Sequence, residues 1–255
     1  MESHQIFYLD WTFWTVIMSL IAVILSQLPP IHLLLRPRRL SVEVHSRIQV
    51  GHLIGNPSAS MVMDLRNTGG RILQIQKITL NISRNGVNVA LLPGQVYFET
   101  PSSQQPVLFV PFTIKPEDSW SHSVSFFKEL DRLEDKELRE MISKMRSYIN
   151  AEIQKNNQKQ EQPTEPVAAS ADLYSPFLEM LKTKFIWLPG EYTADLEVVT
   201  SPDSASFSKC YRFMLFESDT NDLKNDGNFY KFGDGIYYRS NQMADVRVPI
   251  SGHAN

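Results

Sequence analysis

The sequence predicts a mainly β protein: a sandwich or a barrel of short strands, with a long helical insertion and one N-terminal transmembrane helix. Three observations support this fold class. An uncharged apolar run occupies residues 11–28. Short runs of alternating apolar and polar residues, separated by Asn, Gly and Pro, fill residues 41–127 and 184–250. Between these blocks, residues 128–183 are rich in helix-forming residues.

The apolar run follows a short tail, residues 1–10, and extends from Trp11 to Leu28. A helix of this length measures about 27 Å, close to the ~30 Å of a bilayer's hydrocarbon core. Trp11 and Trp14 would lie at the headgroup level. The alternatives are a cleaved signal peptide and a buried core helix, but the tail has no Lys or Arg, which argues against a signal peptide. We therefore expect one membrane span, followed by an interfacial juxtamembrane segment at residues 29–40.

Positive charge lies on one side of this expected span. No Lys or Arg precedes it, whereas Arg36, Arg38 and Arg39 follow it. Because positively charged flanks stay inside, these arginines predict a cell-membrane protein with its N-terminus outside and its main domain in the cytoplasm. The single cysteine, Cys210, agrees with a reducing compartment, because an exported sandwich often carries a disulfide.

Five small or hydroxyl-bearing residues lie along one stripe of the expected span, because they are spaced by three or four residues. Small side chains let helices approach closely in lipid, and hydroxyls bond across helices. Packing against another helix, from a second copy or from a partner, and a chance pattern are equally open interpretations. The residues are Thr12, Thr15, Ser19, Ala22 and Ser26.

Alternation and turn chemistry set the expected strands. In the first block, SVEVHSRIQV and RILQIQKITLNIS alternate apolar and polar residues. Asn67–Gly70 and Ser83–Gly86 predict turns, the second with the Asn-Gly pair of a tight hairpin. In the second block, YTADLEVVT and FSKCYRFMLFE predict strands, ESDTNDLKNDGN a polar loop and FYKFGDGIYYRS a hairpin. Residues 251–255 form a tail.

The insertion begins with Lys128–Lys155, which contains no Gly or Pro. Its apolar residues recur at helical spacing, so we expect a helix of about seven turns with one apolar face. A flexible, polar, Pro-containing linker follows at residues 156–170. After it, ADLYSPFLEMLKTK predicts a second, shorter helix.

MVMDLRNTGGRILQIQKITLNISRNG resembles the strand–turn–strand of bacterial immunoglobulin-like domains of the CARDB and fibronectin type III kind. FTIKPEDSWSHSVSF and LPGEYTADLEVVT resemble two further segments of these domains, in the expected order. The resemblance implies an immunoglobulin-like β-sandwich, here with the helical insertion between the second and third segments. It implies no catalysis, since such domains are usually scaffolds or binding modules.

The residues predict no enzyme, cofactor or metal site. None of the six histidines stands at a spacing typical of metal ligands. DTNDLKNDGN superficially matches a calcium loop, but Lys224 and Gly233 occupy positions that need oxygen ligands. Cys210 lies within an expected strand, where packing is expected rather than reactivity. A net charge of −3 leaves no excess of cations for nucleic acid as a partner.

One segment, FYKFGDGIYYR, concentrates five aromatic side chains beside basic ones. This composition is typical of protein contact surfaces. The alternative, which the frequency of aromatics in strands favours, is a packed sandwich edge. The candidate contact residues are Phe229, Tyr230, Phe232, Tyr237, Tyr238 and Arg239.

Together these features predict a non-enzymatic, single-pass, membrane-anchored scaffold or accessory subunit. It would present a cytoplasm-facing immunoglobulin-like domain to a protein partner, with the lipid bilayer as a further partner. The span and the sandwich surface would serve that contact or join copies into a homo-oligomer. Two alternatives stay open: an extracytoplasmic adhesive or ligand-binding module, and a ligand-gated membrane effector.

Overall fold

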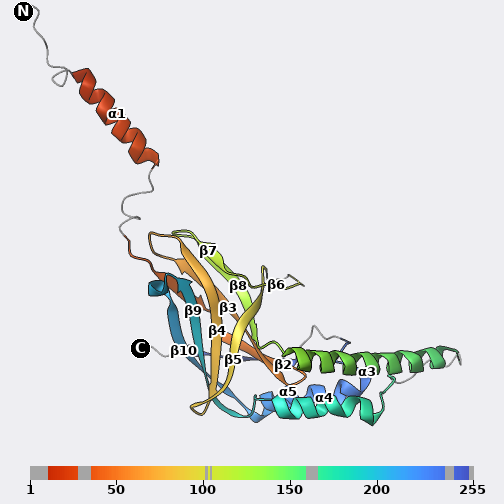
Figure 1. Cartoon of the computed structure of the whole chain (residues 1–255). Helices are drawn as coiled ribbons and strands as arrows, with labels where there is room; N and C mark the ends of the chain where they lie inside the picture. Colours follow the sequence, from red (N-terminus) through yellow and green to blue (C-terminus); the bar gives the residue numbers. More distant parts are fainter. Residues whose placement is uncertain are drawn as a thin grey trace, which may run out of the picture.

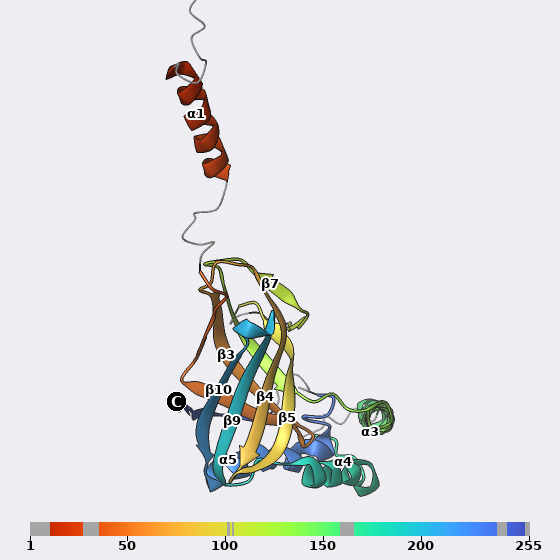
Figure 2. The same cartoon turned by 60° about the vertical axis from the view of Figure 1, so that its left-hand side comes forward.

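The computed structural model describes residues 11–27, 36–100, 103, 105–158, 166–238 and 244–252. It shows a mainly β protein with a strongly curved antiparallel sheet and helices gathered at one end of that sheet (Figure 1; Figure 2). The strands are β1 Leu40–Val44, β2 Arg47–Leu53, β3 Asn56–Asn67, β4 Leu73–Arg84, β5 Val87–Phe98, β6 Val107–Leu108, β7 Phe112–Ile114, β8 Ser119–Phe127, β9 Gly190–Ser201, β10 Phe207–Leu215, β11 Ala244–Pro249 and β12 Ser251–Gly252. The helices are α1 Trp11–Gln27, α3 Arg132–Gln158, α4 Ala171–Lys184 and α5 Glu217–Asn225, with 3-10 turns η2 Asp203–Ala205 and η3 Asp226–Phe232.

The strands form one sheet in the order β11-β2-β3-β8-β5-β4-β9-β10-β12. Strand β5 carries the sheet around a corner, because its residues up to Pro93 pair with β4 whereas Gly94 and later residues pair with β8. A glycine suits this corner. A Cβ at Gly94 would lie 3.1 Å from a methyl carbon of Val124 and 3.3 Å from the carbonyl oxygen of Ile78.

The C-terminal strands bring the two ends of the sheet together. Strand β11 pairs with β2, and β12, which follows after Ile250 alone, pairs with β10. The sheet is therefore nearly closed. This corrects the predicted immunoglobulin-like β-sandwich of two separate layers. The physical reason is that β5 and the β11–β12 connection each pass from one wall to the other.

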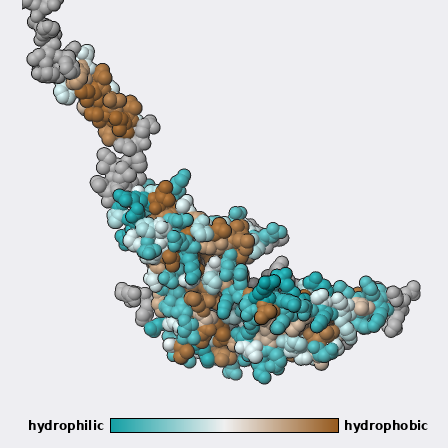
Figure 3. All heavy atoms as spheres, viewed as in Figure 1, coloured by the Kyte–Doolittle hydropathy of each residue, from teal (hydrophilic) through white to brown (hydrophobic). Residues whose placement is uncertain are grey.

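Helix α1 is apolar and lies apart from the other elements (Figure 1; Figure 2), and Figure 3 shows the face in view as largely hydrophobic. Within the ranges that the structure describes, no helix has both the length and the apolar character needed to cross a membrane. With 17 residues α1 measures about 25 Å, less than the ~30 Å of a hydrocarbon core. The predicted single-pass transmembrane helix at residues 11–28 is thus corrected. The cell-membrane localisation, with an outside N-terminus and a cytoplasmic domain, is corrected with it.

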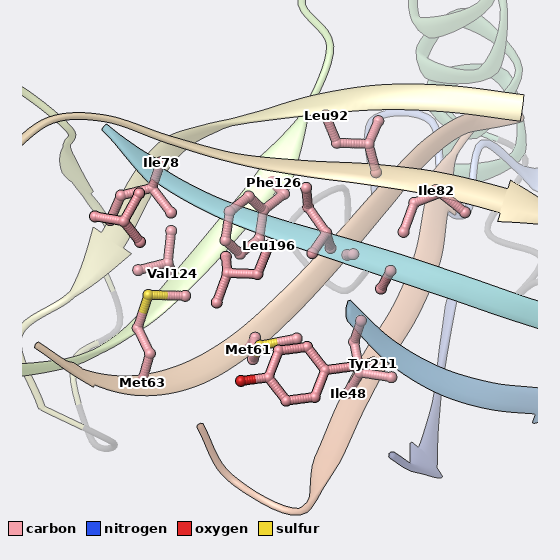
Figure 4. Packing of buried hydrophobic residues seen from close by; sticks show 14 of the residues in the cluster. Ile48, Met61, Met63, Ile78, Ile82, Leu92, Val124, Phe126, Leu196 and Tyr211 are labelled. Atoms are coloured by element: carbon pink, nitrogen blue, oxygen red, sulfur yellow. The ribbon is translucent and has the colours of Figure 1, made fainter. Parts of the chain in front are cut away.

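The main core fills the space between the two walls of the curved sheet. Met61, Met63 and Phe126 from β3 and β8 face Ile78 and Leu196 from β4 and β9 (Figure 4). Each of these side chains is at most 1% exposed. Burying one large apolar side chain stabilises a fold by about 1.5–3 kcal/mol. The apolar residues whose alternation predicted the strands therefore also stabilise the curved, nearly closed sheet.

A second, smaller core lies where α3, α4 and η3 pack beside the β2–β3 turn. Met145 of α3, Phe177 of α4 and Tyr230 of η3 are each at most 1% exposed. Gly55 in the turn has φ +85° and lies so close to α4 that a Cβ would stand 2.7 Å from the Cα of Leu181. The helices therefore form a separately packed layer at one end of the sheet (Figure 2).

The chain after β10 differs from the predicted polar loop and hairpin. It forms α5 and η3, followed by turns in which an isolated bridge joins Asp234 and Tyr238. The backbone N–H of Phe216 donates to the Asp219 carboxylate at 2.8 Å, and the Thr220 hydroxyl donates to the carbonyl of Trp187 at 3.0 Å. A local cap and buried contacts at Thr220 and Leu223 thus hold α5, and its sequence has no periodic apolar face that would predict a helix.

Candidate binding surfaces

Hydroxyl groups of the small-residue stripe on α1 donate to backbone carbonyls of the same helix. The hydroxyl of Thr15 donates to the carbonyl of Thr12 at 2.8 Å, Ser19 to Thr15 at 2.8 Å, and Ser26 to Val23 at 2.7 Å. Ala22 continues the stripe without a polar atom. The exposed surface of α1 consists mainly of large apolar side chains, among them Trp11, which is 84% exposed.

The three arginines that were expected to set the membrane orientation lie directly before β1, the first strand of the sheet. Arg36 Nη1 lies 3.2 Å from Glu117 Oε1, an exposed ion pair. Arg38 and Arg39 are exposed, and the carbonyl of Arg39 accepts the backbone N–H of Thr68 at 3.0 Å. This segment is thus joined to the loop regions that flank β4 and β8.

An apolar groove of about 440 Å³ lies between the C-terminal half of α3 and the chain after α5. We call it the aromatic groove. The base of the groove lies on the second core. Ile149 belongs to both, and its side chain is 1% exposed. Phe229 and Tyr238 remain 45% and 44% exposed. Its lining includes Ile149, Ile153, Val167, Phe229, Phe232 and Tyr238.

The candidate contact residues of this segment thus have different roles. Phe229, Phe232 and Tyr238 line the aromatic groove, whereas Tyr230 is buried in the second core. Burial raises the pKa of Tyr237 to about 12, and the Arg146 guanidinium lies 5.2 Å from the centre of its ring. The remaining candidate, position 239, lies outside the described residues.

A second hollow, of about 680 Å³, lies on the outer face of β2, β3, β8 and β11. We call it the polar trough. Because side chains alternate along a strand, the residues between the core positions of these strands share this outer face. No single stretch of sequence marks the trough, since its lining comes from strands far apart in the chain. Its lining includes Arg47, Gln49, Ser60, Glu99, Ser123 and Arg247.

Two of the groups considered for chemistry, Cys210 and His52, line neither hollow, whereas His45 and His122 are among the residues of the polar trough. Cys210 of β10 has a thiol whose pKa is raised to about 11, first by burial and then by the neighbouring Asp195. His52 is buried, and burial lowers its pKa. In the part of the chain that the structure covers, no three His, Cys, Asp or Glu side chains converge on a metal position. The rejected calcium loop lies in α5 and η3.

Comparison with known proteins assigns no family. No protein-family model matches the chain, and no curated protein matches it. Among solved structures, the chain is similar to a crystal structure of a protein from Archaeoglobus fulgidus, with a TM-score of 0.29 and 10% sequence identity. That match covers 68% of this chain and 98% of the other. The resemblance to CARDB and fibronectin type III domains therefore stays a prediction.

Proposed function

We propose that the protein is a non-enzymatic scaffold or accessory subunit that holds a protein partner in the aromatic groove. The observation that carries this proposal is the exposure of Phe229 and Tyr238, 45% and 44%, beside a hollow with apolar walls. Exposed aromatic side chains at the border of an apolar hollow are typical of the residues that dominate binding energy in interfaces.

The occupant that fits the groove is a polypeptide segment with one or two large apolar side chains next to a Lys or Arg. A volume of about 440 Å³ holds a few side chains rather than a whole domain face. Asp234 is the one charged side chain among the described residues of the lining.

Helix α1 supports the scaffold role. Its apolar side chains are exposed all round, including Trp11, Val16 and Leu20 at 84%, 67% and 59%. It lies at the end of the sheet opposite the helical layer (Figure 1). Large exposed apolar surfaces mark sites of association, so the chain has two such surfaces at opposite ends, as expected of a protein that connects others.

Site-specific photo-crosslinking in the cells that produce the protein tests this proposal. A photoreactive phenylalanine analogue replaces Tyr238 in the full chain, and the same analogue at Phe216 serves as the matched control. Phe216 is 62% exposed and does not line the groove. We expect the analogue at Tyr238 alone to attach to one partner peptide, with an apolar residue next to Lys or Arg. Adding Phe229→Ser should reduce that product about tenfold.

Three results would overturn the proposal. The same products from both positions would show that the groove has no preferred occupant. Crosslinks confined to a second copy of this chain would make the groove a self-association site, and crosslinks confined to lipid would make it a lipid contact.

A further inference from the structure

Two arginines stand side by side on one wall of the polar trough. Gln49 of β2 is paired with Arg247 of β11, and Arg47 is paired with Pro249. Arg47 and Arg247 are therefore diagonal neighbours on the same outer face, with Cα atoms about 7–8 Å apart. Arg47 is exposed, and its guanidinium forms no ion pair or hydrogen bond with the described residues. Two neighbouring cations without an anion between them repel each other.

Gln49 positions the second of these arginines. Its amide nitrogen bonds to the Asp245 carboxylate, and its amide oxygen accepts from Arg247 Nε at 3.2 Å. The terminal nitrogens of Arg247 remain available for a ligand. Asp245 offsets part of the charge of Arg247, and this guanidinium opposes the rise that burial causes in the pKa of Asp245. Gln49 occupies one of the oxygens of the carboxylate. The arrangement resembles the fork that guanidinium groups use to hold carboxylate or phosphate.

Hydroxyl groups form part of the floor of the trough, next to the apolar side chains of Val62 and Phe98. The outward residues of β8 in the trough are Ser121 and Ser123, and Ser123 Oγ lies 3.3 Å from Ser60 Oγ on β3. Hydroxyls both donate and accept. At the end near the arginines, the backbone N–H of Arg47 donates to His45 Nδ1 at 3.2 Å, so the neutral ring of His45 keeps its own N–H on Nε2 as a further donor.

The opposite wall has different chemistry. It carries the Glu99 carboxylate and the hydroxyls of Thr100 and Ser103, which lie 2.8 Å from each other. A ligand that spans the trough thus meets cations at one end and a carboxylate with hydroxyls at the other. A volume of about 680 Å³ is in the range of small-molecule sites, roughly 300–1,000 Å³.

We infer that the polar trough binds a small hydroxylated anion, with its phosphate or carboxylate group between Arg47 and Arg247 and its hydroxyl groups toward Glu99. The class includes sugar phosphates and sugar acids. This site lies on the sheet face, and none of the described residues lines both it and the aromatic groove. The inference therefore stands whether or not the groove holds a protein partner.

Ligand-dependent thermal unfolding of the full chain, in the same mild detergent throughout, tests the inference. The probes are glucose 6-phosphate, gluconate and inorganic phosphate, with glucose and sodium chloride of matched ionic strength as blanks. At about ten times its dissociation constant, a ligand should raise Tm by about 2–4 °C. We expect a rise with glucose 6-phosphate, gluconate or both, and none with glucose. A rise with only one of the two shows which anionic group the site prefers.

Matched variants locate the binding. Arg47→Gln with Arg247→Gln should abolish the rise. Arg66→Gln should keep it, because Arg66 is exposed on β3 outside the trough. Glu99→Gln should reduce the advantage of glucose 6-phosphate over inorganic phosphate. The inference is overturned if none of the anions raises Tm, or if the rise is the same in the double variant as in the original chain.

Discussion

At the scale of single residues, His52 joins two distant parts of the fold. Its Nδ1 accepts the backbone N–H of Gly55 at 3.1 Å, so the ring proton lies on Nε2, which donates to the carbonyl of Leu223 at 2.8 Å. The side chain is 1% exposed. Burial lowers its pKa below the usual 6.5, so the folded protein keeps this imidazole neutral and ties the β2–β3 turn to α5.

The lowered pKa of His52 predicts acid sensitivity. Because the folded-state pKa lies below the unfolded one, the unfolded chain takes up the proton first as pH falls. The stability linked to this proton is complete above about pH 6.5 and is lost below it. Urea unfolding at pH 7.5 and 5.5 should show a smaller loss in His52→Gln than in the original chain. An identical loss in the original chain and in His52→Gln contradicts the prediction.

Asn67 shows how one amide organises the turn that the sequence marked with Asn-Thr-Gly-Gly. Its side-chain nitrogen donates to the carbonyls of Arg71 at 2.8 Å and Ile114 at 2.9 Å. Its side-chain oxygen accepts the N–H of Gly69 at 3.0 Å, and the residue is fully buried. All polar atoms of its side chain are thus used, and they join the end of β3 to the turn before β4 and to β7.

Asn67→Asp should destabilise the protein by about 2–4 kcal/mol, because a buried carboxylate would face two carbonyl oxygens in place of a donor. Chemical denaturation at neutral pH measures the change. Asn88→Asp on the exposed face of β5 is the matched control and should stay within about 0.5 kcal/mol of the original chain. Equal losses in the two variants would show that the turn does not depend on this amide.

At the scale of elements, α3 begins where its cap lies and not where its helix-forming composition begins. The Asp131 carboxylate accepts the N–H groups of Leu133 and Glu134, both at 2.8 Å, and Glu134 Oε2 accepts the N–H of Asp131 at 3.3 Å. Glu134 also binds Lys184 of α4 at 2.6 Å. The predicted start at Lys128 was therefore early, although the Asp-x-x-Glu spacing was visible in the sequence.

Removing this cap should be costly for the helical layer. Asp131→Ala is expected to lower the free energy of unfolding by about 1 kcal/mol, measured by denaturant unfolding. Glu129→Ala, at an exposed position that precedes the cap, should have a smaller effect. If both variants lose the same free energy, charge rather than capping would explain the change.

At the scale of the whole molecule, the two hollows arise from how the elements meet. The aromatic groove needs α3 to lie beside residues 229–238, which are about 80 positions later in the chain. The polar trough needs β2 to lie between β3 and β11, which brings Arg247 beside Arg47. In both cases the residues were present in the sequence. Their neighbours come from the packing of α3 beside residues 229–238 for the groove, and from the sheet order for the trough.

The sequence by itself determined the local features: the strand alternation, the Asn-Gly and Asn-Thr-Gly turns, the long amphipathic helix and the apolar character of residues 11–27. These depend on interactions within a few residues, which composition and spacing record. Tertiary structure decided the closure of the sheet through β5 and β11–β12, and the helix at Glu217–Asn225, where buried contacts replace a periodic face. It also decided which aromatics are buried and which arginines become neighbours, because each outcome depends on side chains far apart in the chain.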